Sequence, residues 1–90
     1  MAIAVLFHPR PMSTDQYDEC IRMLEEAGAG HPPGRLYHAC YESDGGLNVF
    51  DVWESKESFE SFGPTLMPIL QRLGINPGEP AISQIHNVIT

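Results

Sequence analysis

The sequence is poor in basic residues. Lysine and arginine together number 5 among 90 residues, against 12 aspartates and glutamates, and the formal net charge at pH 7 is -7. A surface with this excess of negative charge repels nucleic-acid phosphates and anionic lipid headgroups. The composition therefore argues against nucleic acid and against a membrane surface as partners.

Cysteines and long apolar runs are also scarce. Cys20 and Cys40 are too far apart for a metal knuckle or a redox CxxC pair, so we expect two free thiols in a reducing cytosol. No apolar run approaches the roughly 20 residues that cross a bilayer. The first residues lack the basic start of a signal peptide. Together these absences predict a cytoplasmic protein.

The clearest positive pattern is a β-hairpin over residues 35–54. Two runs rich in β-branched and aromatic residues flank Asp-Gly-Gly at 44–46, which supplies a tight turn with positive φ. If the first two of these residues form the turn, His38 faces Asp51. If the last two form it, His38 faces Trp53. The sequence leaves both registers open.

The two faces of this hairpin differ in character in either register, because side chains alternate along a strand. We expect the almost wholly apolar face to pack beneath helices as core. The mixed face is unusual both for core and for open solvent, and it predicts a partly buried cavity. The apolar face consists of Tyr37, Ala39, Tyr41, Phe50 and Val52, and the mixed face of Leu36, His38, Cys40, Glu42, Val49, Asp51 and Trp53.

Two helices are predicted outside the hairpin. Ser13 and Gln16 form a capping-box pattern at the start of the first helix, and Gly28 helps to end it. Ser55 is placed to cap the second helix, which carries a broad apolar face. Gly63-Pro64 interrupts that face, so we expect a break or kink there.

Strands over residues 3–7 and 81–90 complete the order β-α-β-β-α-β. This order is typical of one ferredoxin-like α+β domain over residues 1–90, with an antiparallel four-stranded sheet and both helices on one face. Because two helices cover only one face, we expect a second copy to pack sheet to sheet. The product is a homodimer, a dimeric α/β barrel that encloses space.

The chain resembles a known group of dimeric α/β-barrel proteins, those related to the antibiotic-biosynthesis monooxygenase (ABM) superfamily. The resemblance is carried by Tyr17-Asp18, by Gly34 four residues before His38, and by the run Asp51-Val52-Trp53-Glu54-Ser55, which leads into a helix with spaced aromatics. It spans nearly the whole chain. It is more specific for the fold than for an activity, since members include cofactor-free oxygenases, haem-degrading enzymes and proteins without assigned activity.

The resemblance also implies a site. The oxygenases place a tryptophan of the third strand inside the cavity, together with a polar residue four positions earlier. Trp53 matches the tryptophan, whereas Val49 stands where an asparagine is expected. No local motif identifies a haem-ligating histidine.

The candidate site lies in a pocket between sheet and helices. His38 and Asp51 are the candidate catalytic residues, because histidine exchanges protons near neutral pH and a mid-strand aspartate needs a specific partner. The candidate substrate contacts are Trp53, Tyr17, Cys40, Val49 and His86. His38, Cys40 and Asp51 could together hold a metal ion, but without a second ligand motif we expect neither metal nor cofactor.

Two functions remain open from the sequence. The first is cofactor-independent oxidation of a small aromatic or polycyclic ligand, in which Trp53 stacks the substrate, His38 takes a phenolic proton and Asp51 orients His38. The second is a non-catalytic binding or regulatory dimer whose polar groups satisfy one another. An open cavity lined by all three residues would favour the first, whereas a close contact between His38 and Asp51 with no free volume beside Trp53 would favour the second.

Overall fold

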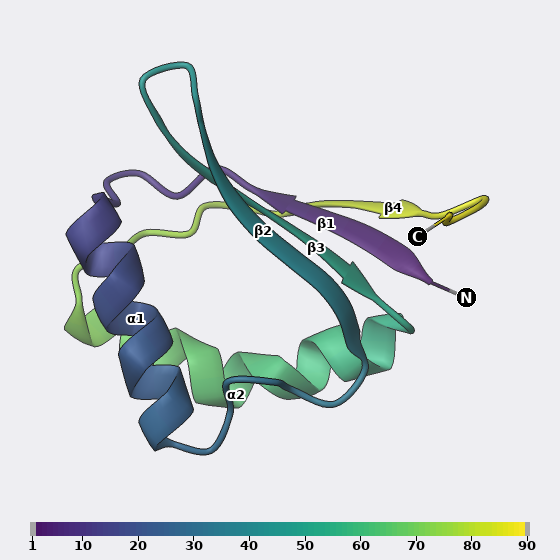
Figure 1. Cartoon of the computed structure of the whole chain (residues 1–90), viewed down its shortest axis with the longest axis horizontal. Helices are drawn as coiled ribbons and strands as arrows, with labels where there is room; N and C mark the ends of the chain where they lie inside the picture. The colour runs from purple at the N-terminus through teal and green to yellow at the C-terminus, as the bar shows by residue number, and fades with distance from the viewer. Residues whose placement is uncertain (1, 90) are drawn as a thin grey trace.

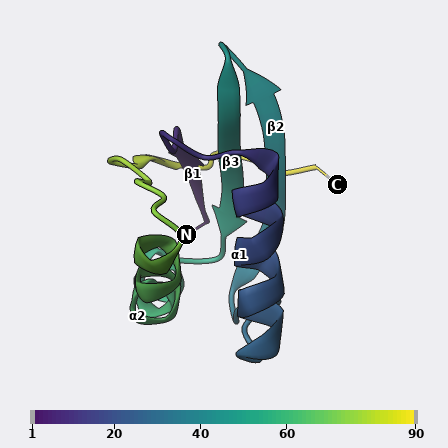
Figure 2. The same cartoon turned by 90° about the vertical axis from the view of Figure 1, so that its left-hand side faces the viewer.

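The computed structural model of the chain describes residues 2–89, in which the predicted ferredoxin-like order of elements is confirmed. The antiparallel sheet has the strand order β2-β3-β1-β4, and both helices lie on one side of it (Figures 1 and 2). No helix in this range is long and apolar enough to cross a membrane. The elements are β1 (Ile3–Phe7), α1 (Thr14–Glu26), β2 (Arg35–Ser43), β3 (Gly46–Trp53), α2 (Lys56–Arg72) and β4 (Ala81–Gln84).

The hairpin between β2 and β3 adopts the first of the two predicted registers. Asp44 and Gly45 form the turn with φ of 55° and 77°, values that Asp-Gly tolerates at low cost. His38 therefore lies opposite Asp51. The hairpin projects well beyond the rest of the molecule (Figures 1 and 2).

A β-bulge interrupts the regular alternation at the start of β2. Arg35 pairs with Trp53, whereas Tyr37 pairs with the next residue of β3, Val52, so that Leu36 is the extra residue. Leu36 is 61% exposed. Because Trp53 and Asp51 share a face of β3, their partners Arg35 and His38 share a face of β2. Strict alternation would have placed Arg35 on the opposite face.

The expectation that the apolar hairpin face lies beneath the helices is wrong. The mixed face lies there: His38 contacts Tyr17 of α1, and Trp53 packs against aromatic rings of α2. On the other face, Tyr37 and Tyr41 are 55% and 44% exposed. Alternation tells which residues share a face, but the rest of the fold decides which face the helices cover.

The choice of face follows from the central strand β1. Its Ile3 and Val5 lie opposite Trp53 and Asp51, respectively, and both are buried. The mixed face of the hairpin thus continues into the most apolar face of β1, and burying this combined surface is the more favourable arrangement.

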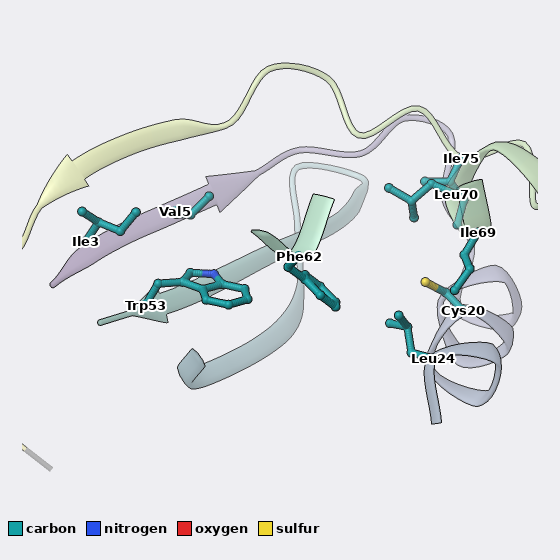
Figure 3. Close-up of a cluster of buried hydrophobic side chains, with 9 residues drawn as sticks. All are labelled: Ile3, Val5, Cys20, Leu24, Trp53, Phe62, Ile69, Leu70 and Ile75. Atoms are coloured by element: carbon teal, nitrogen blue, oxygen red, sulfur yellow. The ribbon is translucent and has the colours of Figure 1, made fainter. Parts of the chain in front are cut away.

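The hydrophobic core has two ends (Figure 3). At one end Trp53, with none of its surface exposed, lies beside the two buried residues of β1. At the other end, α1 and the second half of α2 meet. Phe62 lies between the two ends. The cluster comprises Ile3, Val5, Cys20, Leu24, Trp53, Phe62, Ile69, Leu70 and Ile75.

The predicted helix starts are confirmed. The Ser13 hydroxyl accepts from the Gln16 backbone N–H, and the Gln16 side chain accepts in return from the Ser13 N–H. Ser55 caps α2 in the same way through the Ser58 N–H.

The predicted break in the second helix is absent, since α2 is one continuous helix through Pro64 and Pro68. Each proline removes the donor that would bond the carbonyl four residues earlier. Both prolines are exposed, as is Glu60. The freed carbonyls of Glu60 and Pro64 therefore lie on a side of the helix that water reaches.

The last strand is shorter than predicted, because β4 ends at Gln84. Ile85 still donates to the Ala2 carbonyl, over 3.0 Å, but β1 itself begins at Ile3. Beyond this point the described residues offer β4 no neighbouring strand. Thr90, the end of the predicted strand, lies outside the described residues.

Candidate functional site

A small cavity lies between the sheet and the two helices. Its volume is about 70 Å³, and most of the side chains that line it are apolar. They come from every layer around it and include Phe7, Met12, Leu24, Phe62, Leu66 and Leu70. An apolar lining of this kind favours an apolar group of a ligand.

A chain of three polar side chains forms one wall of this cavity. Asp51 Oδ1 lies 2.5 Å from His38 Nδ1, and His38 Nε2 lies 2.6 Å from the Tyr17 hydroxyl. The carboxylate can only accept, so Nδ1–H donates to it and Nε2 accepts from the Tyr17 O–H. Asp51 is only 5% exposed. One hydrogen bond to Asp51 on β3 and one from Tyr17 on α1 thus define the orientation of the His38 imidazole.

Tyr17 is held as a proton donor. Burial raises the pKa of its hydroxyl from 10.0 to about 12, with a smaller contribution from the Cys40 thiol. The hydroxyl therefore keeps its proton at neutral pH. The phenol ring of Tyr17 is parallel to the His38 imidazole, with 6.0 Å between ring centroids and 4° between planes. Tyr17, one of the candidate substrate contacts, thus lines the cavity.

A second hollow of about 320 Å³ lies alongside the first and shares with it the wall formed by Tyr17, His38 and Arg35. This second, outer hollow is also lined by Asp18, Glu25 and His31, whereas the other residues that line the first, inner hollow are mostly apolar. Sequence reasoning did not single out Arg35. Arg35 reaches this wall because of the β-bulge, and a bulge cannot be predicted from a pattern that assumes strict alternation of side chains.

The remaining candidate residues are distributed unevenly. Val49 lines the cavity. Cys40 lies on β2 two residues after His38 and is partly buried, but it does not line the cavity. Burial raises the pKa of its thiol. His86 lies beyond the end of β4, exposed and away from both hollows. The expectation that His86 sits on the last strand is thereby corrected.

Trp53 occupies the core rather than the cavity wall. Its ring centroid lies 5.6 Å from that of Phe62 and 5.8 Å from that of Phe59. Its buried Nε1–H has no hydrogen-bond partner among residues 2–89. Phe62 lines the cavity, and in Figure 3 it lies between Trp53 and Leu24. Direct stacking of a ligand on Trp53 would require Phe62 to move.

The Asp51–His38–Tyr17 chain can move a proton. When an acidic hydroxyl approaches Tyr17, its proton can pass to the tyrosine oxygen while the tyrosine proton passes to Nε2. The Asp51 carboxylate then stabilises the imidazolium. Among the described residues, no group of three or more histidine, cysteine, aspartate or glutamate side chains is arranged to hold a metal ion.

Comparison with known proteins gives a fold. No family profile and no curated protein sequence matches the chain. Several solved structures do. A candidate antibiotic biosynthesis monooxygenase from Chloroflexus aurantiacus is 19% identical with a TM-score of 0.68, and the match covers 100% of this chain and 98% of that one. SnoaB, a cofactor-independent oxygenase from Streptomyces nogalater, is 14% identical with a TM-score of 0.64 and covers 98% and 94%.

A second candidate antibiotic biosynthesis monooxygenase, from Deinococcus radiodurans, is 13% identical with a TM-score of 0.63 and covers 100% and 97%. At these identities the similarity shows a common fold and carries no residue roles. The resemblance to ABM-like proteins is thus confirmed as a ferredoxin-like architecture over the full length of the chain.

Proposed function

We propose that the protein binds a small aromatic phenol or enol in the cavity and catalyses its oxidation by molecular oxygen without a bound cofactor. One observation carries this proposal. A partly buried, hydrogen-bonded chain of Asp51, His38 and Tyr17 forms one wall of a cavity whose other lining residues, apart from Arg35, are mostly apolar. Solved structures with this fold, named as oxygenases, support it.

In the proposed reaction the substrate loses a proton to the Tyr17–His38–Asp51 chain and becomes an electron-rich anion. This anion passes electrons to molecular oxygen. One oxygen atom then joins the activated carbon, and the other leaves as water, so that a CH₂ group and O₂ become a C=O group and H₂O. The electrons come from the substrate itself, and the protein supplies the base and a dry environment.

The size of the inner cavity limits the substrate. At about 70 Å³ it offers roughly half the space of an engineered cavity of about 150 Å³ that binds benzene. A single ring therefore enters only with small shifts of the surrounding side chains. In our proposal the reacting ring lies at Tyr17 and the remainder of the molecule occupies the outer hollow of about 320 Å³.

Oxygen uptake with hydroxylated naphthalenes and anthrones tests the proposal. We expect uptake by the unmodified protein and a loss of about 10²-fold or more in His38→Gln, because the proton acceptor is removed. His86→Gln makes the same change at an exposed position outside both hollows and should keep full activity. Equal rates in both variants, or no uptake with any compound, would contradict the proposed reaction.

A non-catalytic ligand-binding dimer is the second candidate. It is favoured by the closed hydrogen-bond chain, in which the three polar groups already satisfy one another, and by the position of Trp53 outside the residues that line the cavity. Saturable binding of the same compounds, seen by calorimetry and without any oxygen uptake, would select this function over the enzyme.

We also propose that two copies associate through the sheet face that the helices leave open. Tyr37 and Tyr41 are large and exposed on this face, beside the partly buried Phe50. Exposed apolar surface of this kind is typical of a protein–protein contact. Sedimentation should therefore show a dimer that Tyr41→Glu converts to a monomer. Met67→Glu, on an exposed position of α2, is the matched control and should leave the dimer intact.

A further inference from the structure

Arg35 is the one strongly basic side chain that borders the site. The bulge at Leu36 places it on the same face of β2 as His38, and it lines both the inner and the outer hollow. A regular strand would have directed it away from the helices. Bulges commonly re-aim a side chain in this way beside functional sites.

The guanidinium of Arg35 is positioned but largely unused. Nη2 donates to the Gly30 carbonyl over 3.1 Å, and the group lies 6.0 Å from the centroid of the Phe62 ring. These two contacts fix its orientation. A guanidinium has five N–H donors, and within residues 2–89 this is its only hydrogen bond to the protein.

The other charges around the outer hollow do not neutralise Arg35. Asp18 and Glu25 line the same hollow together with His31, yet neither carboxylate forms an ion pair with Arg35. In contrast, Arg22 on the outer surface of α1 pairs with both Glu19 and Glu26. A chain with 12 acidic side chains thus leaves this arginine free of an ion pair at its cavity.

We propose that Arg35 is a further catalytic residue, whose guanidinium binds the oxyanion that forms on the substrate when its proton moves to Tyr17 and His38. The inference rests on the proposed function, since it names the group that stabilises the anion of that reaction. Arg35 and the two proton-handling side chains border both hollows, so a hydroxyl at Tyr17 lies within the field of the guanidinium. Burial raises the pKa of Tyr17 most; the positive charge of Arg35 acts to lower this pKa, and the negative charge of Asp51, which lines the same inner hollow, raises it by less than Arg35 lowers it. An anion of the substrate at the same place would be stabilised by the same charge.

The ligand class follows from this arrangement. The site should prefer the ionised form of a phenol or enol over a neutral aromatic of the same shape. This preference can be measured without turnover, because 4-nitrophenol absorbs visible light only when it is ionised.

The experiment titrates bound 4-nitrophenol with pH in the unmodified protein, in Arg35→Gln and in Arg72→Gln. Arg72 is exposed in the last turn of α2, so its replacement makes the same change in net charge away from the site. We expect the bound phenol to ionise at least about one pH unit lower in the unmodified protein than in Arg35→Gln, which is about a tenfold preference for the phenolate. Arg72→Gln should match the unmodified protein.

Nitrobenzene, which cannot ionise, shows whether the pocket survives the substitution. Its affinity should be the same in all three proteins. If Arg35→Gln does not fold, the test uses the unmodified protein only. A pKa of bound 4-nitrophenol below its value in free solution supports the proposal, and a pKa at or above that value overturns it.

The failures can be told apart. If 4-nitrophenol binds but ionises equally in the unmodified protein and Arg35→Gln, the role of Arg35 is overturned and the proposed function stands. If the unmodified protein binds neither compound, the phenol site itself is overturned and the role of Arg35 with it.

Discussion

Trp53 and Asp51 lie two residues apart on β3 and share a face, yet their surroundings differ. We call the surroundings of Trp53 the packed end and those of Asp51 the polar end. Trp53 is completely buried among apolar side chains and leaves its Nε1–H without a partner. Asp51 is 5% exposed and bonds to His38, which bonds in turn to Tyr17. One end is packed, and the other combines polar groups with empty space.

The packed end contributes mainly to stability, and the polar end carries the groups that could act chemically. Apolar burial contributes directly to the free energy of unfolding. A buried acid–base pair contributes little on balance, because desolvation offsets much of its attraction. A chain of 90 residues has limited core to spare. Its retention of a polar group and a hollow at one end of the core is consistent with a functional role for that end.

The largest effect should come from the packed end. Trp53→Ala is expected to lower the free energy of unfolding by about 3–5 kcal/mol, because it leaves a cavity among Ile3, Phe59 and Phe62. Urea denaturation followed by circular dichroism measures this loss. A variant that remains stable but no longer binds ligand would show instead that Trp53 acts in the site.

At the polar end, Asp51→Asn should act mainly on the reaction. The neutral amide cannot stabilise an imidazolium at His38, so we expect the rate of oxygen uptake to fall about 10²-fold or more. Unchanged kinetics in a folded variant would remove Asp51 from the proton chain.

Tyr17 links the polar end to stability at high pH. Its pKa is raised in the folded protein to about 12 from 10.0, so the folded state holds the proton more tightly than the unfolded state. The resulting stability is complete below pH 10.0 and is lost as the pH rises towards about 12. Tyr17→Phe should flatten this decline, measured as the unfolding free energy between the two pH values. An equally steep decline in the variant would assign the effect to another group.

Cys40 should show the smallest effect of all. It neighbours the site along β2 but lines neither hollow, so Cys40→Ala should cost less than about 1 kcal/mol and leave ligand affinity unchanged. Calorimetric titration with a naphthol checks the affinity. A clear loss of binding would extend the site beyond the residues that line it here.

Much of the fold was predictable because its signals are local. The Asp-Gly-Gly run predicted a tight hairpin in one of two registers, and the observed one places His38 opposite Asp51. The Ser13 and Ser55 caps defined where both helices begin. Each of these features depends on a few neighbouring residues and on strong backbone preferences.

What could not be predicted depends on distant parts of the chain. The bulge that turns Arg35 towards the cavity is a departure from alternation, and nothing in the local residue pattern specifies it. The face that the helices cover was decided by the neighbouring strand β1. Pro64 was compatible with an unbroken helix because it lies on the exposed side of α2.

Nuclear magnetic resonance of the protein titrated with 1-naphthol would separate the two ends most directly. Trp53 is the only tryptophan, so its indole N–H gives one isolated signal from the packed end, while the His38 imidazole reports on the polar end. Binding at the proposed site should shift the His38 and Tyr17 signals strongly and the Trp53 signal only weakly. A strong shift at Trp53 with His38 unchanged would contradict the proposed site and return the ligand to the tryptophan.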